Sequence, residues 1–320
     1  MKLITEVALP EYPFRLDHQM PIVLMGSCFT ENMGRLLERY RFPVCINPFG
    51  VTYNPLSVKR SLQALMHKTA YEEQDLNLHN ELWFSFDHST GFSSTNKEEA
   101  LKGINLSFES AKSQLNKAGV LILTWGTSWV YSYNKTGQVV CNCHKIPAKE
   151  FTRTRLTPGE IVKAYESLIP ELLEFNPGLR ILYTISPVRH WKDGAHGNQL
   201  SKASLLLAGD ELQKQFSGNF FYFPSYEIVM DELRDYRYYA EDMLHTNDQT
   251  SKYIWGKFQQ VLISDGSAEI IRDLDPLLKM LEHRPMNKGT YSHGKLEDQL
   301  QEKLNYLKRK YSELNLDNIT

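Results

Sequence analysis

The chain has 320 residues, of which 42% are hydrophobic and 23% are charged, so it can bury a sizeable core and is not a disordered chain. Its 36 basic and 38 acidic side chains give a formal net charge of −2, which argues against a general nucleic-acid-binding protein because those carry a basic excess. Four cysteines are too few for a disulfide framework.

The sequence predicts neither a transmembrane helix nor a secretory signal. Apolar runs such as Val120–Leu123 fall far short of the roughly 18 residues that a transmembrane helix needs. The N-terminal segment carries Glu6 and Glu11 and lacks the apolar stretch of a secretory signal. We therefore expect a cytoplasmic protein without a membrane partner.

The N-terminal part predicts the opening unit of an α/β sheet. Pro21–Met25 is a short apolar run that ends at Gly26, which is typical of a buried strand in a parallel sheet. Thr30–Arg41 is predicted to be a helix because its apolar residues repeat at helical spacing, namely Met33, Leu36, Leu37 and Tyr40.

Three more buried strands are predicted at Val120–Thr124, Arg180–Ile185 and Phe220–Phe223, with helices at Pro158–Phe175 and Ser201–Phe216 between them. Strands separated by helices of this length predict βαβ units, hence a parallel, three-layer α/β sheet. In such sheets the functional groups gather at the carboxyl ends of the strands.

Two polar stretches, residues 71–105 and 131–155, are weakly periodic and are expected to form loop insertions or a small hairpin cap. The tail predicts an amphipathic helix of about 20 residues. We divide the chain into an α/β domain, residues 1–284, and a linker with a helical extension, residues 285–320. The apolar stripe of this helix should pack on the domain or on a partner helix, which would allow a homo-oligomer; it consists of Leu296, Leu300, Leu304, Leu307, Tyr311 and Leu314.

A candidate nucleophile follows the first strand in the sequence Gly26-Ser27-Cys28-Phe29-Thr30. The glycine permits a tight turn, and the unpaired N–H groups of a helix start would lower the pKa of a thiol placed there. We expect Cys28 to be the nucleophile and Ser27 the alternative. The structural interpretation makes Cys28 a small core residue and Ser27 a helix cap.

A candidate general base lies after the last strand. In Asp242-Met243-Leu244-His245 an acid precedes a histidine by three residues, which suits an imidazole base oriented by a carboxylate. Such pairs also occur by chance in exposed loops. The order of nucleophile after the first strand and Asp-x-x-His after the last strand favours the catalytic interpretation.

The sequence resembles the GSCFA-domain family, because six motifs occur in order over about residues 1–265. They are Gly26-Ser27-Cys28-Phe29-Thr30, Asn47-Pro48-Phe49-Gly50 with Tyr53-Asn54-Pro55, the stretch from Thr124 to Tyr131, Asn142-Cys143-His144-Lys145, Ser186-Pro187-Val188-Arg189-His190, and Asp242-Met243-Leu244-His245. Thr30 departs from the Ala that ends the family signature.

That family is remotely similar to the SGNH/GDSL hydrolases, which implies a flavodoxin-like sheet. The resemblance places Cys28 in the position of the nucleophile and matches Asp242 and His245 to the last block. It implies an oxyanion hole formed by Gly50, Gly126 and Ser128, although Ser128 stands where the superfamily has Asn.

Several residues in these motifs are candidates for binding substrate: Asn47, Asn142, His144, Arg189 and His190. A guanidinium after a strand end can bind a carboxylate or phosphate, although a surface ion pair is the alternative. The spacing of Cys141, Cys143 and His144 is not a common zinc pattern, so no metal is expected. No Gly-x-Gly-x-x-Gly or P-loop motif occurs, so no nucleotide cofactor is expected.

These observations predict an acyl-ester hydrolase that uses a Cys/Ser-His-Asp arrangement on a small-molecule or glycan ester. An acyltransferase on the same scaffold is one alternative, since only the acceptor differs. A non-catalytic glycan-binding module on a decayed hydrolase fold is the other, favoured by the replaced block residues and disfavoured by the retained Asp242 and His245.

Overall fold

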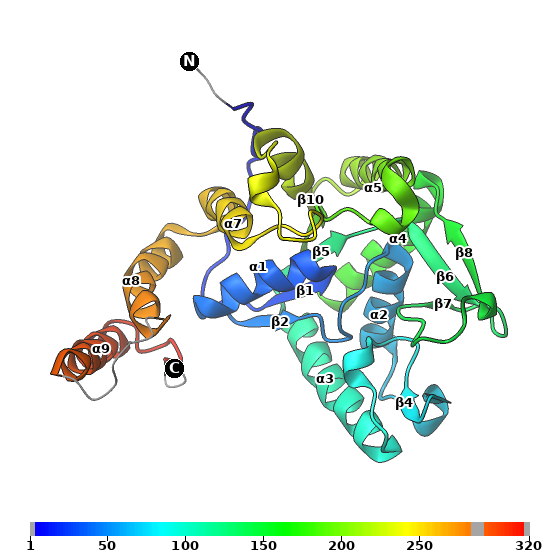
Figure 1. Cartoon of the computed structure of the whole chain (residues 1–320), viewed down its shortest axis with the longest axis horizontal. Helices are drawn as coiled ribbons and strands as arrows, with labels where there is room; N and C mark the ends of the chain where they lie inside the picture. The colour runs from blue at the N-terminus through cyan, green and yellow to red at the C-terminus, as the bar shows by residue number, and fades with distance from the viewer. Residues whose placement is uncertain (1–3, 283–290, 317–320) are drawn as a thin grey trace.

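A computed structural model describes residues 4–282 and 291–316. At its centre lies a five-stranded parallel sheet, in which β1 pairs with β2 on one side and with β5 on the other (Figure 1). From one edge to the other the strands are β2 (Val44–Ile46), β1 (Ile22–Gly26), β5 (Val120–Trp125), β9 (Arg180–Ile185) and β10 (Phe220–Tyr222). Numbered along the chain, this order is 2-1-3-4-5.

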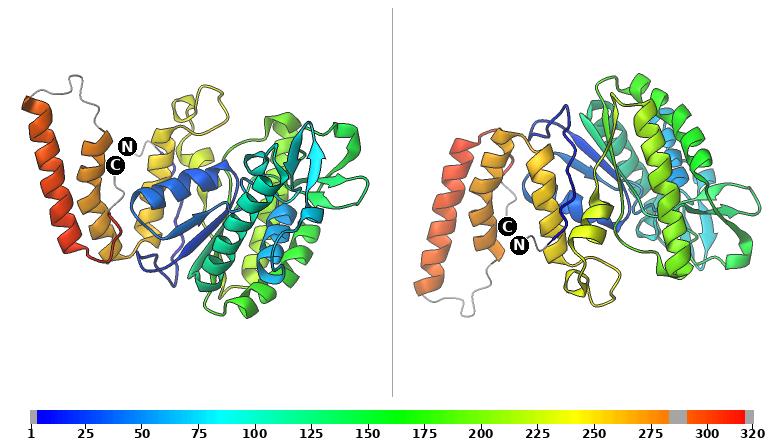
Figure 2. Two further views of the ribbon diagram at one scale, coloured as in Figure 1. Left: turned by 90° about the horizontal axis from the view of Figure 1, so that it is seen from below. Right: turned by 90° about the horizontal axis from the view of Figure 1, so that it is seen from above.

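Helices cover both faces of the sheet, as the two views in Figure 2 show. Alternate residues of β1 point to opposite faces, so that Val23 and Met25 join one apolar core while Ile22 and Leu24 join another. The first core is covered by α2 (Pro55–His67), α3 (Lys97–Lys117), α4 (Pro158–Phe175) and α5 (Gly194–Gln215). The second is covered by α1 (Cys28–Arg39), α7 (Asp248–Leu262) and α8 (Asp265–Glu282). The prediction of a three-layer α/β fold is confirmed.

The two polar stretches contain more regular structure than expected. The first holds a small hairpin of β3 (Asn77–His79) and β4 (Leu82–Phe84), one of the two expected alternatives. Its last residues belong to α3, so the expectation is wrong for residues 97–105. The second contributes to a three-stranded antiparallel sheet of β6 (Trp129–Tyr133), β7 (Val139–Val140) and β8 (Phe151–Arg155).

Short helical segments complete the described fold. A single turn, α6 (Ser225–Glu227), continues into a π-helix at Ile228–Glu232. Short 3-10 turns occur at Glu73–Asp75, Thr90–Phe92, Ala148–Glu150, Trp191–Asp193 and Tyr236–Tyr238. Within the described ranges no helix combines the length and the apolar character needed to span a membrane.

The C-terminal helix α9 (Tyr291–Lys310) packs beside α8 (Figure 2). Leu307 is buried, and the rest of the described stripe packs against the second core, namely Leu300, Leu304, Tyr311 and Leu314. Lys310 pairs with Glu269 and Asp273 of α8. The stripe therefore packs on the chain's own body, as expected. The side chain of Leu296, the linker residues 285–290 and the boundary at residue 284 lie outside the described part.

Candidate functional site

The turn after β1 requires glycine. Gly26 has φ +148°, and a Cβ there would lie 2.3 Å from the carbonyl oxygen of Thr124 on β5. Its N–H donates to Oδ1 of Asn47 (2.8 Å), which fixes the turn from the β2 side. Ser27 and Cys28 are thereby held at the carboxyl end of β1, between β2 and β5. This is the switch point at which doubly wound sheets bind ligands.

The two candidate nucleophiles differ in exposure. Ser27 is the N-cap of α1, and its Oγ is buried without a hydrogen-bond partner among the described residues. Cys28 is the first residue of α1 and is half-buried. Burial raises the pKa of the Cys28 thiol, and the Glu31 carboxylate adds to the rise; backbone N–H groups and the charge of Lys202 act in the opposite direction. The prediction of a lowered pKa is therefore wrong, because desolvation outweighs the helix start.

A pocket of about 270 Å³ lies over Cys28 and brings together residues from five of the six motifs. It is lined by Ser27, Cys28, Tyr53, Gly126, Ser186, Val188, Arg189, His190, Trp191 and His245. Cys28 and His245, which are more than two hundred positions apart in the sequence, thus face one cavity. Burial lowers the pKa of His190, the second histidine in the pocket.

Asp242 and His245 form a compact turn. Oδ1 of Asp242 accepts the backbone N–H groups of Leu244 and His245 (both 2.9 Å), and Oδ2 accepts Nδ1–H of the His245 ring at 2.5 Å. The hydrogen bond to His245 holds the pKa of Asp242 at about 2. The ring nitrogen Nε2 is left for other partners. No hydrogen bond joins His245 to Cys28 or Ser27 among the described residues.

The expected oxyanion residues are engaged elsewhere. The N–H of Gly50 donates to the carbonyl of Asn47 (2.7 Å), and the N–H of Gly126 donates to the carbonyl of Tyr53 (2.8 Å). The Ser128 hydroxyl is buried and donates to Ser201. Of these three residues only Gly126 lines the Cys28 pocket, so the structure does not support Gly50 and Ser128 as oxyanion donors. Arg189 lines the Cys28 pocket, and the N–H groups of Cys28 and Phe29 at the start of α1 face the Cys28 thiol.

Two of the expected substrate contacts have structural roles. Asn47 is buried, and its Oδ1 accepts the backbone N–H of Gly26. His144 is buried, its Nε2 lies 3.0 Å from the Ser85 carbonyl oxygen and 3.1 Å from that of His88, and burial lowers its pKa to about 4. His144 therefore fastens the loop after β4 and is not available to a substrate.

A second pocket, of about 340 Å³, adjoins the first through Tyr53 and His190, which line both. Its walls include Trp129 and Tyr131 of β6 and the expected contact Asn142. The guanidinium of Arg153 lies 4.0 Å from the centre of the Trp129 ring, and Nζ of Lys192 donates to the Tyr131 hydroxyl (3.1 Å). This pocket is thus aromatic with a basic rim.

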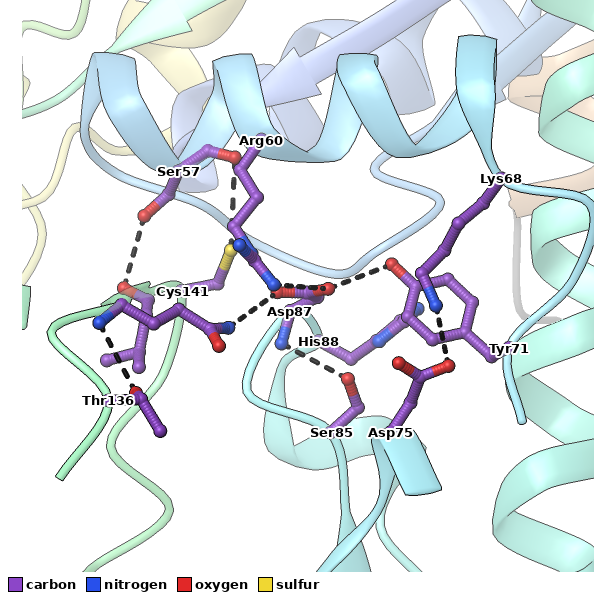
Figure 3. A network of polar contacts seen from close by, with 12 residues as sticks. Ser57, Arg60, Lys68, Tyr71, Asp75, Ser85, Asp87, His88, Thr136 and Cys141 are labelled. Carbon is purple, nitrogen blue, oxygen red and sulfur yellow. Dashed lines mark hydrogen bonds and ion pairs between the residues drawn. The ribbon is translucent and has the colours of Figure 1, made fainter. Parts of the chain in front are cut away.

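Behind the second pocket, a polar network ties the insertions to α2. Figure 3 shows Arg60 and Tyr71 converging on the Asp87 carboxylate, with Cys141 nearby. Burial raises the pKa of Cys141 to about 12, so this thiol stays protonated. The described residues hold no group of three or more His, Cys, Asp or Glu side chains that could bind a metal.

Lys202 of α5 binds two residues of the Cys28 pocket from behind the lining, and the sequence patterns do not indicate it. It is fully buried, and its Nζ donates to the carbonyls of Gly126 (2.7 Å) and Ser186 (2.5 Å), which follow β5 and β9. Burial lowers its pKa to about 7. Its neighbour Ser201 accepts the N–H of Ser128 (2.8 Å). One sequence feature indicates that Lys202 is buried: it lies three residues before Leu205, on the same face of the predicted helix.

Two protein-family models match the sequence of this chain. The model described as the GSCFA family matches residues 21–258, well over half of the chain. The chain belongs to the GSCFA family. A second model, the C-terminal domain of GSCFA domain proteins, matches residues 274–319, so the end of α8 and all of α9 are a family feature as well. No curated protein matches the chain. Both Cys28 and His245 of this GSCFA protein lie inside the first match.

Proposed function

We propose that this GSCFA-family protein is an acyl-ester hydrolase, with Cys28 as nucleophile, His245 as general base and Asp242 orienting the imidazole. The observation that carries the proposal is that Cys28 and His245 line one pocket while Asp242 binds Nδ1 of the same ring. The strand order 2-1-3-4-5 is that of flavodoxin-like sheets, which supports the remote relation to SGNH hydrolases.

The reaction has two steps. Nε2 of His245 takes the thiol proton as Sγ of Cys28 attacks the ester carbonyl, and the tetrahedral oxyanion faces the N–H groups at the start of α1 and Arg189. Collapse releases the alcohol, which receives the proton from His245, and leaves a thioester on Cys28. Water, deprotonated by His245, then attacks the thioester and releases the acid, and the proton returns to the thiol.

The raised pKa of Cys28 shapes this mechanism. Because burial keeps the thiol protonated near neutral pH, the enzyme needs a base at the moment of attack and does not hold a preformed thiolate. His245 stands on an exposed turn and its Nε2 is not bound to Asp242, so the proposed proton transfer requires a movement of that turn that brings Nε2 to the sulfur. Substrate closure of this kind is common in enzymes.

The aromatic second pocket favours an acyltransferase as the second candidate. Trp129 and Tyr131 offer flat faces for a sugar ring, and an acceptor hydroxyl there would replace water in the second step. A glycan ester as substrate would occupy the same pocket. We also propose a cytoplasmic location, because all four cysteines are free thiols and a reducing compartment favours free thiols.

Turnover of a panel of acyl esters and acyl thioesters tests the proposal. Cys28→Ala and His245→Ala should each lower kcat/KM by at least about 100-fold, because nucleophile and base act as one unit. Cys45→Ala, which removes a buried thiol from β2, and His67→Ala, which removes an exposed histidine, are the matched controls and should retain activity. Wild-type protein that turns over no ester or thioester, and no labelling of Cys28 or Ser27 by acylating probes, would favour the non-catalytic module.

A further inference from the structure

Three large apolar side chains stay exposed around one hollow beside the Cys28 pocket. Trp191 is 53% exposed, Tyr236 74% and Met243 53%. They line a pocket of about 430 Å³, a size typical of small-molecule sites. Exposed apolar surface is unfavourable in water, so apolar side chains gathered around a hollow indicate a ligand that covers them.

The hollow is continuous with the candidate catalytic pocket. Arg189 and Trp191 line both, and Leu244 of the hollow immediately precedes His245. Nε of Arg189 is buried and has no hydrogen-bond partner in the described part of the chain. A ligand oxygen at the seam between the two pockets would satisfy this donor.

The lining of the hollow is apolar where it is deepest. Val229 and Leu233 are buried and Met230 is half-buried, whereas the charged residues at the rim have partners of their own. Arg234 pairs with Asp231 (2.7 Å), and Asp235 pairs with Arg237 (2.7 Å). Asp242 pairs with His245, so Arg189, at the junction with the Cys28 pocket, is the one charged lining residue without an ion pair in the described part of the chain. The rest of the hollow is apolar or internally paired, and it suits an alkyl chain whose polar end lies near Arg189.

Two unusual backbone segments shape the hollow. Val229 and Met230 belong to the π-helix Ile228–Glu232, a conformation that is rare and frequent at functional sites. Met243 has φ +59°, in the left-handed region that non-glycine residues seldom adopt. Such strain persists where the surrounding structure enforces it, often at ligand sites.

We propose that this hollow binds the acyl chain of the substrate, and that the protein therefore prefers medium-chain acyl groups to acetyl. The inference rests on the proposed function, since it places the reacting carbonyl at Cys28. The chain then runs past Arg189 and Trp191 into the hollow, while the alcohol part extends through Tyr53 and His190 into the aromatic pocket.

Hydrolysis of acetyl, butanoyl and octanoyl esters of one chromogenic alcohol tests the preference. In the wild type, kcat/KM should rise with chain length, by up to about fourfold for each methylene that the hollow buries. Met243→Lys places a charge at the hollow and should flatten this rise. Leu106→Lys, which alters a similarly exposed apolar residue on α3, is the matched control and should leave it intact. Equal rates for all three esters would overturn the inference while leaving the proposed function standing.

Binding of octanoate, measured by calorimetry, separates the hollow from the chemistry. The wild type and Leu106→Lys should bind octanoate, and Met243→Lys should bind it at least tenfold more weakly. Binding with this pattern, without turnover of any ester, would support the hollow and refute the proposed hydrolase. Absent binding, or equal binding by all three proteins, would refute the hollow as an acyl-chain site whatever the activity shows.

Discussion

Replacing Lys202 by Met should change how the stability of the protein depends on pH. In the native fold Nζ of Lys202 is buried and donates to the carbonyls of Gly126 and Ser186. Burial lowers its pKa from 10.5 to about 7. Between these two pH values the unfolded chain binds more protons than the native protein, so this group makes the free energy of unfolding rise with pH.

The size of the effect follows from the two pKa values. Between pH 7 and pH 9 the amine alone should increase the free energy of unfolding by about 2 kcal/mol. The Lys202→Met substitution would leave the two carbonyls unpaired, at a cost of about 1–3 kcal/mol each, but it would also remove the cost of burying a charge. The difference in stability between wild type and Lys202→Met should therefore be small at pH 7 and about 2 kcal/mol larger at pH 9.

Urea denaturation at pH 7, 8 and 9 measures this difference. The comparison is best made in a Cys28→Ala background, because the charge of the Cys28 thiolate interacts with Lys202. Lys163→Met, which removes an exposed lysine from α4, is the control and should leave the pH dependence unchanged. Parallel stability curves for the Lys202→Met protein and its parent would refute the assignment of a depressed pKa to this amine.

Three further predictions concern the turn, the thiol and the tail. Gly26→Ala should lower the free energy of unfolding by at least about 2 kcal/mol, seen as a lower urea midpoint, because its Cβ would collide with the Thr124 carbonyl; an unchanged midpoint would contradict the turn geometry. The rate of Cys28 alkylation by iodoacetamide, measured on the peptide that contains it, should rise with a midpoint above the free-thiol pKa of about 8.5, because burial raises the pKa of Cys28; a midpoint below that value would reverse the assigned direction. Leu307→Ala should cost about 2–5 kcal/mol of stability, whereas the exposed Leu106→Ala should cost little, and equal effects would show that α9 does not pack as described.

The fold could be predicted where strands and helices are long and apolar. The buried parallel strands β1, β5 and β9 are mostly apolar runs, which can be recognised without any knowledge of tertiary contacts. The three-residue strand β2 and the polar strands of the small sheet carry no comparable signal. The sequence does not predict the start of α3, because its first turns are mainly polar and charged and its larger buried apolar residues begin only with Ile104 and Phe108.

The candidate site could be predicted only in part, for a different reason. The motif order placed Cys28 and His245 in one site, because the carboxyl ends of parallel strands meet at one edge. The sequence does not show the long-range environment of the site. It shows neither that the donor groups of Gly50 and Ser128 are bound to Asn47 and Ser201, nor that burial raises the pKa of Cys28. Lys202 escaped prediction because a buried charge contradicts the pattern by which core residues are recognised.

The central claim is that an acyl group passes through Cys28, and trapping the thioester tests it most directly. Wild type and Ser27→Ala should gain the mass of one acyl group when they are quenched during turnover of an octanoyl thioester, and peptide mapping should place that mass on Cys28. His245→Ala should accumulate it more slowly. Turnover without a covalent adduct, or an adduct on Ser27 that persists in Cys28→Ala, would contradict the assignment of the nucleophile.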